Sequence, residues 1–250
     1  MNKELPIIKK NIEEAISTTL SQLPKLQNKP IFFALDISGS CWFNLGRNPY
    51  AKEMKSLVQL MGTIFEKNGH EIGACFFTDQ IELYQAPKDT SLALILETFS
   101  TIIPVSTETD IVHSLETLMR YCTQDSLIIV ISDFNSHFNS LFLESEQNSL
   151  VTKDTHIILP IVLNGSASDH IPKLGLLSLE DPESGEHVII NTYSKETRAK
   201  YDAIQEVQRL YRRRFFSITG WRSIDLNTKT DLTKQFHNWA ASLSDQGEMS

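Results

Sequence analysis

Five side chains that carry oxygen stand where a parallel sheet would bring them together. Asp36, Ser38 and Ser40 directly follow one continuous apolar run. Asp133 follows a second apolar run, and Thr109 stands where a helix is expected to begin. In an open parallel sheet, ligands bind beyond the carboxyl ends of the strands, at the point where the winding direction reverses. We therefore expect all five side chains to converge at one edge of the sheet.

The converging groups are two carboxylates and three hydroxyls, without an imidazole or a thiolate. Oxygen ligands of this kind suit Mg²⁺ or Mn²⁺ in octahedral geometry and disfavour zinc or copper. Because Mg²⁺ loses its water reluctantly, the neutral hydroxyls can bind it directly while the carboxylates act through water. Gly39 permits the tight turn that aims both serines at one point. An ion held in this way stays short of negative charge and can accept a carboxylate from outside.

Each of these residues also has an ordinary structural interpretation. An aspartate at a strand end is often a turn residue, and Ser38 and Ser40 could form local turn hydrogen bonds. Thr109 alone is more often the N-cap of a helix than a metal ligand. The metal site is favoured because three separate segments carry the expected residue types at the expected places.

The elements that must position these residues follow from apolar runs and helical spacing. Strands are predicted at Ile31–Leu35, Ile72–Phe77, Ile81–Tyr84, Leu127–Ser132, Ile157–Val162, Leu176–Leu179, Val188–Ile190 and Phe215–Thr219. Helices are predicted at 5–23, 50–65, 92–99, 111–122, 195–214 and 232–243. Strands that alternate with helices indicate an α/β fold with a doubly wound, mostly parallel sheet and helices on both faces.

Three local patterns refine this prediction. The short turn between Ile72–Phe77 and Ile81–Tyr84 predicts one antiparallel strand at an edge of the sheet. Pro160 lacks a donor for the ladder and suggests a bulge or an edge position. The triplet Arg212–Arg214 is interpreted as a helix C-terminus, where the helix dipole favours positive charge.

The chain is expected to form one large domain. Residues 1–29 are predicted to form an N-terminal amphipathic helix and a connector, residues 30–243 the α/β domain, and residues 244–250 a flexible tail. A length of 250 residues suffices to bury a core of several strands.

Composition excludes some classes of protein. The net charge of −8 argues against a general binder of nucleic acid or anionic membranes. A spanning helix needs about 20 apolar residues, and no run approaches that length, so no membrane span is predicted. The three cysteines form no CxxC pair, and the first thirty residues lack a signal peptide pattern, so we expect a reduced, cytoplasmic protein.

The segments that carry the oxygen ligands resemble the metal-ion-dependent adhesion site of von Willebrand factor A domains. The similarity lies in Asp36-Ile37-Ser38-Gly39-Ser40, in Thr109 followed by Asp110-Ile111, and in Asp133 after a buried strand. A closer resemblance is to a bacterial family of uncharacterised A-domain-like proteins associated with MoxR-type AAA+ ATPases. Its features here are Ser132-Asp133-Phe134, in place of the commoner Thr-Asp-Gly, and Gly175 with the acidic stretch 181–186.

The resemblance implies a non-enzymatic interaction module and an adaptor for such an ATPase. It implies that Ser38, Ser40 and Thr109 bind Mg²⁺ or Mn²⁺ directly, and that the two aspartates act mainly through water. An exposed Asp or Glu of a protein partner would complete the coordination. Cys41 departs from the family pattern, which usually has Met there, and only about 30 residues precede the metal loop where many members have a longer region.

Enzyme functions remain as alternatives. Asp36 at a strand end is also the nucleophile position of Mg²⁺-dependent phosphohydrolases of the haloacid-dehalogenase type. That chemistry needs a second acid two residues later, where this chain has Ser38, and paired acids where it has only Asp133. Cys41 and Arg47 match the Cys-x5-Arg spacing of tyrosine phosphatases but lack a glycine-rich anion loop. The chain has no GxxxxGK and no HExxH pattern, so neither nucleotide binding nor a zinc protease is supported.

Overall fold

A six-stranded sheet lies at the centre of the structure, a computed structural model that describes residues 29–42, 49–135, 156–164, 173–180, 187–228, 230–231 and 234–235. Three of its inner strands are β1 (Ile31–Asp36), β2 (Ile72–Phe77) and β4 (Leu127–Ser132), and every residue of these three is buried. Continuous apolar runs have no polar face to turn to water, so they are stable where both faces of the sheet are covered.

The strand order confirms the predicted class. The strands lie in the order β3-β2-β1-β4-β5-β8, where β3 is Ile81–Gln85, β5 is Ile157–Asn164 and β8 is Ile224–Asn227. Of these six strands, only β3 runs antiparallel to its neighbour, and it pairs with β2 at the edge of the sheet, as predicted. The chain moves outward from β1 to β2 and β3, then returns to place β4 on the other side of β1. The winding therefore reverses between β1 and β4.

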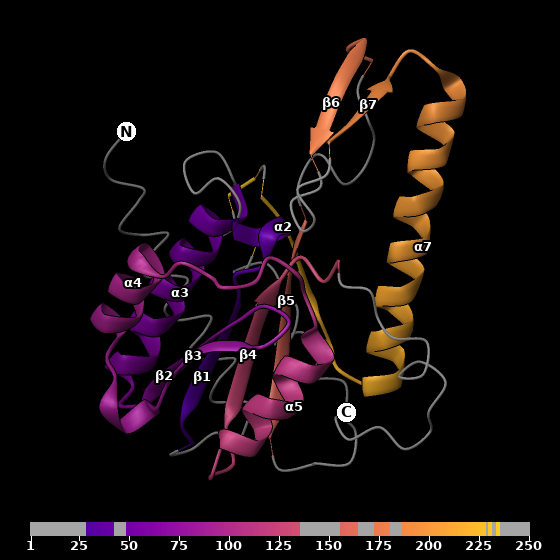
Figure 1. The fold of residues 1–250 in the computed structure, drawn as a ribbon. Coiled ribbons are helices and arrows are strands. Elements are labelled where there is room, and N and C mark those ends of the chain that lie inside the picture. The colour runs from indigo at the N-terminus through magenta and orange to yellow at the C-terminus, as the bar shows by residue number, and fades with distance from the viewer. Residues whose placement is uncertain are drawn as a thin grey trace.

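Helices cover both faces of the sheet (Figure 1). One face packs against α3 (Pro49–Lys67) and α4 (Leu92–Thr101). The other face packs against α5 (Ile111–Tyr121) and the C-terminal part of α7 (Lys195–Thr219). Neighbouring residues of β1 alternate between the two cores, with Phe33 in one and Phe32 in the other.

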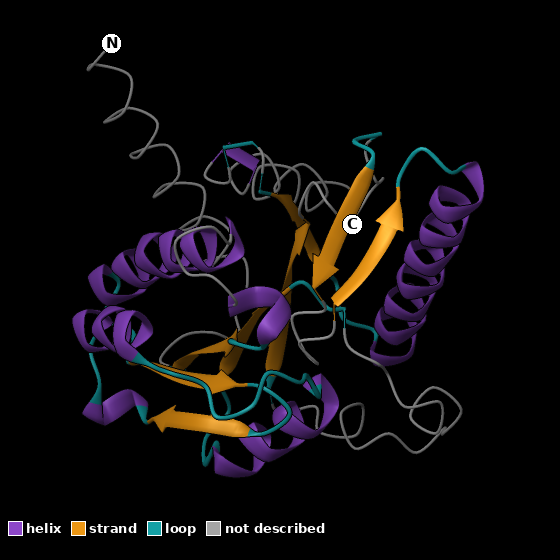
Figure 2. Ribbon diagram, turned by 45° about the horizontal axis from the view of Figure 1, so that its top comes forward, coloured by secondary structure: helices purple, strands orange, loops and turns teal. Residues whose placement is uncertain are grey.

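A separate hairpin stands beyond the carboxyl ends of the central strands, on the side of the short helix α2 (Gly39–Trp42) (Figures 1 and 2). Strands β6 (Leu176–Glu180) and β7 (His187–Asn191) pair antiparallel, which confirms the predicted hairpin. They form a two-stranded sheet of their own. At its base the buried Thr192 hydroxyl donates to the Gly175 carbonyl at 2.8 Å, and this contact fixes the start of α7 relative to the hairpin.

Helix α7 corrects the sequence prediction for 215–219. The predicted strand at Phe215–Thr219 is wrong, because α7 continues through these residues and ends at Gly220, which has a φ of 69°. Phe215 and Thr219 lie one helical turn apart and are both buried, and the Thr219 hydroxyl donates to the Phe215 carbonyl at 3.0 Å. The next strand is β8. The triplet Arg212–Arg214 accordingly lies inside the helix and not at its C-terminus.

Strand β5 is an interior strand, with β4 on one side and β8 on the other. Its partner β8 pairs only from Ile161 onward, whereas Pro160 faces Val130 of β4. The missing N–H of Pro160 therefore falls in the half of β5 that has no second partner strand among the described residues. The predicted helices at 5–23 and 232–243 lie wholly or mostly outside the described residues, and the predicted domain bounds stay predictions.

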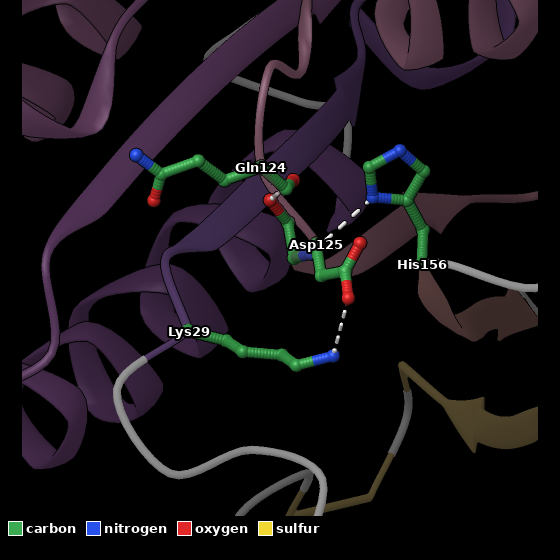
Figure 3. A network of polar contacts seen from close by, with 5 residues as sticks. Lys29, Gln124, Asp125 and His156 are labelled. Atoms are coloured by element: carbon green, nitrogen blue, oxygen red, sulfur yellow. Dashed lines mark hydrogen bonds and ion pairs between the residues drawn. The ribbon is translucent and has the colours of Figure 1, made fainter.

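Polar contacts join the amino-terminal ends of three strands (Figure 3). Lys29, before β1, pairs with Asp125, before β4, at 3.3 Å. The Ser126 backbone N–H donates to Nδ1 of His156, before β5, at 3.2 Å. Complementary polar groups, of which only Asp125 is exposed, thus join the strands at this end of the sheet.

Gly73 on β2 provides a test of how closely the antiparallel edge is packed. A Cβ atom there would lie 2.7 Å from the Gln85 carbonyl oxygen and 2.9 Å from a ring carbon of Phe32. We expect Gly73→Ala to destabilise the chain by about 1–3 kcal/mol in denaturant unfolding, because β3 or the ring must move. Gly69→Asn is the control, since nothing lies within 4 Å there and Asn tolerates the φ of 80°. Equal stability of Gly73→Ala and wild type would contradict the packing.

Candidate metal centre

Asp36 and Asp133 lie side by side at the carboxyl ends of the two central strands. Asp36 is the last residue of β1, and Asp133 follows β4, which pairs with β1 in parallel. Leu35 is opposite Ile131, so Asp36 falls beside Ser132, and the Ser132 hydroxyl donates to Asp36 Oδ2 at 2.5 Å. Both carboxylates are buried, with 0% and 3% exposure. The strand register thus places two acids at the point where the winding reverses.

The loop after β1 brings the two predicted serines to the same place. The Ser38 backbone N–H donates to Asp36 Oδ1 at 3.0 Å. The hydroxyl oxygens of Ser38 and Ser40 lie 3.4 Å apart. A hydrogen bond from the Ser40 side chain to Asp133 completes this series of contacts, and it lowers the pKa of the Asp133 carboxyl. Four of the five predicted residues are therefore joined through direct contacts.

Thr109, the fifth predicted residue, lies on the loop between α4 and α5 and is half-buried. Two residues earlier, the Thr107 carbonyl accepts a hydrogen bond from the Gly39 backbone N–H at 2.7 Å. One residue later, Asp110 caps α5 by accepting from the His113 backbone N–H at 2.9 Å. The first contact holds the segment against the serine loop and the second fixes the start of α5. Thr109 itself stays a predicted ligand.

The two acids carry an electrostatic penalty. Burial, followed by the nearby Asp133 charge, raises the pKa of Asp36 from 3.8 to about 6, although hydrogen bonds from Ser132 and Ser38 oppose the shift. Burial likewise raises the pKa of Asp133, against the effect of hydrogen bonds from Asn135 and Ser40 and of the Arg212 charge. Buried carboxylates that repel each other are stabilised by a cation between them.

Cys41 is a residue of the site that the sequence interpretation missed. Its sulfur and carboxylate oxygens of Asp36 and Asp133 all lie within 4.8 Å of one another, and Cys41 is fully buried. Burial, followed by the two carboxylates, raises the pKa of the thiol well above its ordinary value. A neutral thiol is a poor ligand for a hard cation. The sequence feature that could have placed Cys41 in the site is its position directly after Ser40.

Phe134 is a second residue whose role at the site the sequence interpretation did not predict. Its φ of 52° lies in the left-handed region, at the place where the commoner Thr-Asp-Gly pattern has glycine. The conformation costs a non-glycine residue about 1–2 kcal/mol. The ring is buried and packs against Phe216 and Phe215, with centroids 5.2 and 6.4 Å away, and the Phe134 N–H donates to Ser132 Oγ at 2.8 Å. Phe134 thus connects α7 to the segment that carries Asp133.

Arg212 forms a further link between α7 and the site. Its Nη1 atom donates to the Asp133 carbonyl oxygen at 3.2 Å. A cavity of about 100 Å³ opens beside this contact and is bounded by Asp133, Asn135 and polar side chains of α7. The guanidinium is therefore part of the wall next to the buried acids.

The donors present fit Mg²⁺ or Mn²⁺. Two buried carboxylates and two hydroxyls in mutual contact offer oxygen atoms to one cation, and the electrostatic penalty of the acids favours its binding. We expect the thiol to remain outside the coordination because its deprotonation in this site is costly.

Comparison with known proteins identifies the family. Residues 22–211 match the family described as "Protein of unknown function DUF58". The chain belongs to the DUF58 family. No curated protein matches this DUF58 chain.

Two solved structures are similar to parts of the DUF58 chain. One is proximal thread matrix protein 1 from the mussel byssus, at 20% identity over 54% of this chain, with a TM-score of 0.40. Another is the pilus adhesin SpaC from Lactobacillus rhamnosus GG, at 12% identity over 87% of this chain, with a TM-score of 0.38. The matched regions span only 35% and 30% of those two chains.

Within the described part of the chain, no helix combines the length and apolar character that crossing a membrane requires.

The raised pKa of Asp36 predicts a pH dependence of stability. A carboxyl whose folded pKa exceeds its unfolded value stabilises the fold below pH 3.8, and this contribution is lost as the pH rises through about 6. In metal-free buffer at pH 8 we therefore expect Asp36→Asn to raise the free energy of unfolding by about 3 kcal/mol. The gain should vanish near pH 4. Denaturant unfolding at both pH values measures it, and a destabilised variant at pH 8 would contradict the account.

Cobalt substitution tests the role of Cys41. We expect Co²⁺ bound by the wild-type chain to give only the weak absorption of an oxygen-ligated ion, and Cys41→Ser to leave Co²⁺ affinity within about twofold. An intense near-ultraviolet sulfur-to-cobalt band that disappears in Cys41→Ser would contradict a site built for hard cations.

Proposed function

We propose that this DUF58 chain is a non-enzymatic protein-interaction module with a fold of the von Willebrand A type. It holds Mg²⁺ or Mn²⁺ at Asp36, Ser38, Ser40, Thr109 and Asp133 and binds an exposed Asp or Glu of a protein partner. The observation that carries this proposal is the chain of contacts from Asp36 through both serines to Asp133, buried at the reversal of winding.

The roles of the ligands follow from charge. In the proposal, the hydroxyls of Ser38, Ser40 and Thr109 bind the ion directly and the aspartates act mainly through water. Both carboxylate oxygens of Asp36 already accept hydrogen bonds, from Ser38 and Ser132, which supports an indirect role. Neutral direct ligands leave the cation able to attract an outside carboxylate.

The wider setting rests on resemblance. We propose that the chain acts in the cytoplasm as an adaptor for a MoxR-type AAA+ ATPase. Copurification from the native host, with mass spectrometry of the bound proteins, tests this part separately. Recovery of such an ATPase that depends on Ser38 and Ser40 would support the adaptor role, and a partner set without any AAA+ ATPase would contradict it.

A Mg²⁺-dependent phosphohydrolase at the same crevice is the alternative function. Its nucleophile would be Asp36, whose two oxygens are engaged in hydrogen bonds, and Ser38 occupies the place of the general acid. Hydrolysis of p-nitrophenyl phosphate that Asp36→Asn abolishes would favour the phosphohydrolase and overturn the module.

Thermal unfolding with and without Mg²⁺ tests the proposed site. At 100 times its Kd, a ligand stabilises the folded state by about 2.7 kcal/mol, which corresponds to about 5–10 °C in Tm for a chain of this size. We expect this shift in wild type and its loss in the double variant Ser38→Ala/Ser40→Ala. Ser56→Ala, an exposed serine on α3, is the control that keeps the shift. An equal shift in the double variant would contradict the assignment.

A further inference from the structure

The middle of α7 has its polar and apolar faces reversed. Gln205, Gln208, Arg209 and Arg212 follow helical spacing and all line the cavity beside Asp133. The large apolar side chains of the same turns are exposed, by 48–57%: Ile204, Val207, Leu210 and Tyr211. A helix that only supports a fold turns its apolar stripe inward. The middle of α7 instead turns its polar stripe toward the cavity, where these side chains are available to a ligand.

The cavity borders the proposed metal centre at Asp133. It lies where Asn135, after β4, and Asn164, at the end of β5, face α7, and Asp133 belongs to both the cavity wall and the site. Arg212 donates to the Asp133 carbonyl, so its guanidinium stands next to the residue that would face the ion. A group bound in the cavity would therefore lie close to a group held by the metal.

The charges of the cavity favour an anion. A cation would balance the carboxylates of Asp36 and Asp133, which leaves the guanidinium groups of Arg209 and Arg212. Arg209 makes a half-exposed ion pair with Glu206 at 3.5 Å. Arg212 makes no such close ion pair among the described residues, although its charge acts on the nearby Asp133 carboxyl and lowers its pKa. Each guanidinium presents five donors in a plane, which matches the two oxygens of a carboxylate.

We propose that this cavity binds a second carboxylate of the acidic partner, close in sequence to the one that the metal holds. The partner segment then carries two acidic residues at i and i+2, which point to the same side of an extended chain. The amides of Gln205, Gln208 and Asn135 bind its peptide groups. This inference rests on the proposed function, because the first carboxylate needs the ion.

Two labelled peptides, used with the full chain and Mg²⁺, test the inference by fluorescence anisotropy. They are acetyl-Gly-Asp-Gly-Asp-Gly-amide and its counterpart with Asn in place of the second Asp. We expect wild type to prefer the two-acid peptide by about tenfold. The ratio of the two affinities should fall to near one in Arg212→Gln and also in Arg209→Gln. The second variant keeps the test valid if loss of the contact between Arg212 and Asp133 disturbs folding. Arg213→Gln, exposed and outside the cavity, should retain it.

The outcomes separate this inference from the proposed function. If Mg²⁺ raises Tm but wild type binds both peptides equally, or binds neither, the proposal that the cavity binds a second carboxylate is wrong. The same holds if Arg213→Gln abolishes the preference as strongly as Arg212→Gln, since a general charge effect would then explain it. Absence of any Mg²⁺-dependent change in Tm would instead overturn the metal centre itself.

Discussion

Two carboxylates buried side by side at the ends of β1 and β4 are the constraint on which the rest of the structure depends. Asp36 and Asp133 repel each other in a place from which water is excluded, and burial raises the pKa of both. Folding alone would favour apolar or amide side chains there. The acids are retained at a cost in stability, which is typical of groups that bind a ligand.

The surrounding elements hold these acids in fixed positions. Parallel pairing of β1 and β4 sets the two strand ends level, and Ser132 bridges them through its contact with Asp36. Phe134 takes a left-handed conformation directly after Asp133, and its buried ring against α7 offsets that strain. Because Arg212 of α7 contacts the same segment, the helix that closes the core also forms one wall of the site.

Much of the architecture could be predicted because buried parallel strands have a distinctive composition. The apolar runs that became β1, β2 and β4 located the central strands, and the polar residues after them located the site. The sequence Phe215–Thr219 misled because aromatic and β-branched residues favour strands, whereas burial of Phe215 and Thr219 on one helical face decided the outcome. Cys41 was missed because the sequence suggested only a phosphatase nucleophile or a departure from the family pattern, and only the fold shows it beside two acids. The reversed faces of α7 could not be predicted, since which side of a helix faces a cavity depends on distant segments.

The most direct test of the central claim is an anomalous difference map from crystals of the full chain soaked in Mn²⁺. The account predicts an anomalous peak at coordination distance from the Ser38 and Ser40 hydroxyls, between the carboxylates of Asp36 and Asp133. Ordered Mn²⁺ at other positions only, with the contacts among these four residues unchanged, would contradict it.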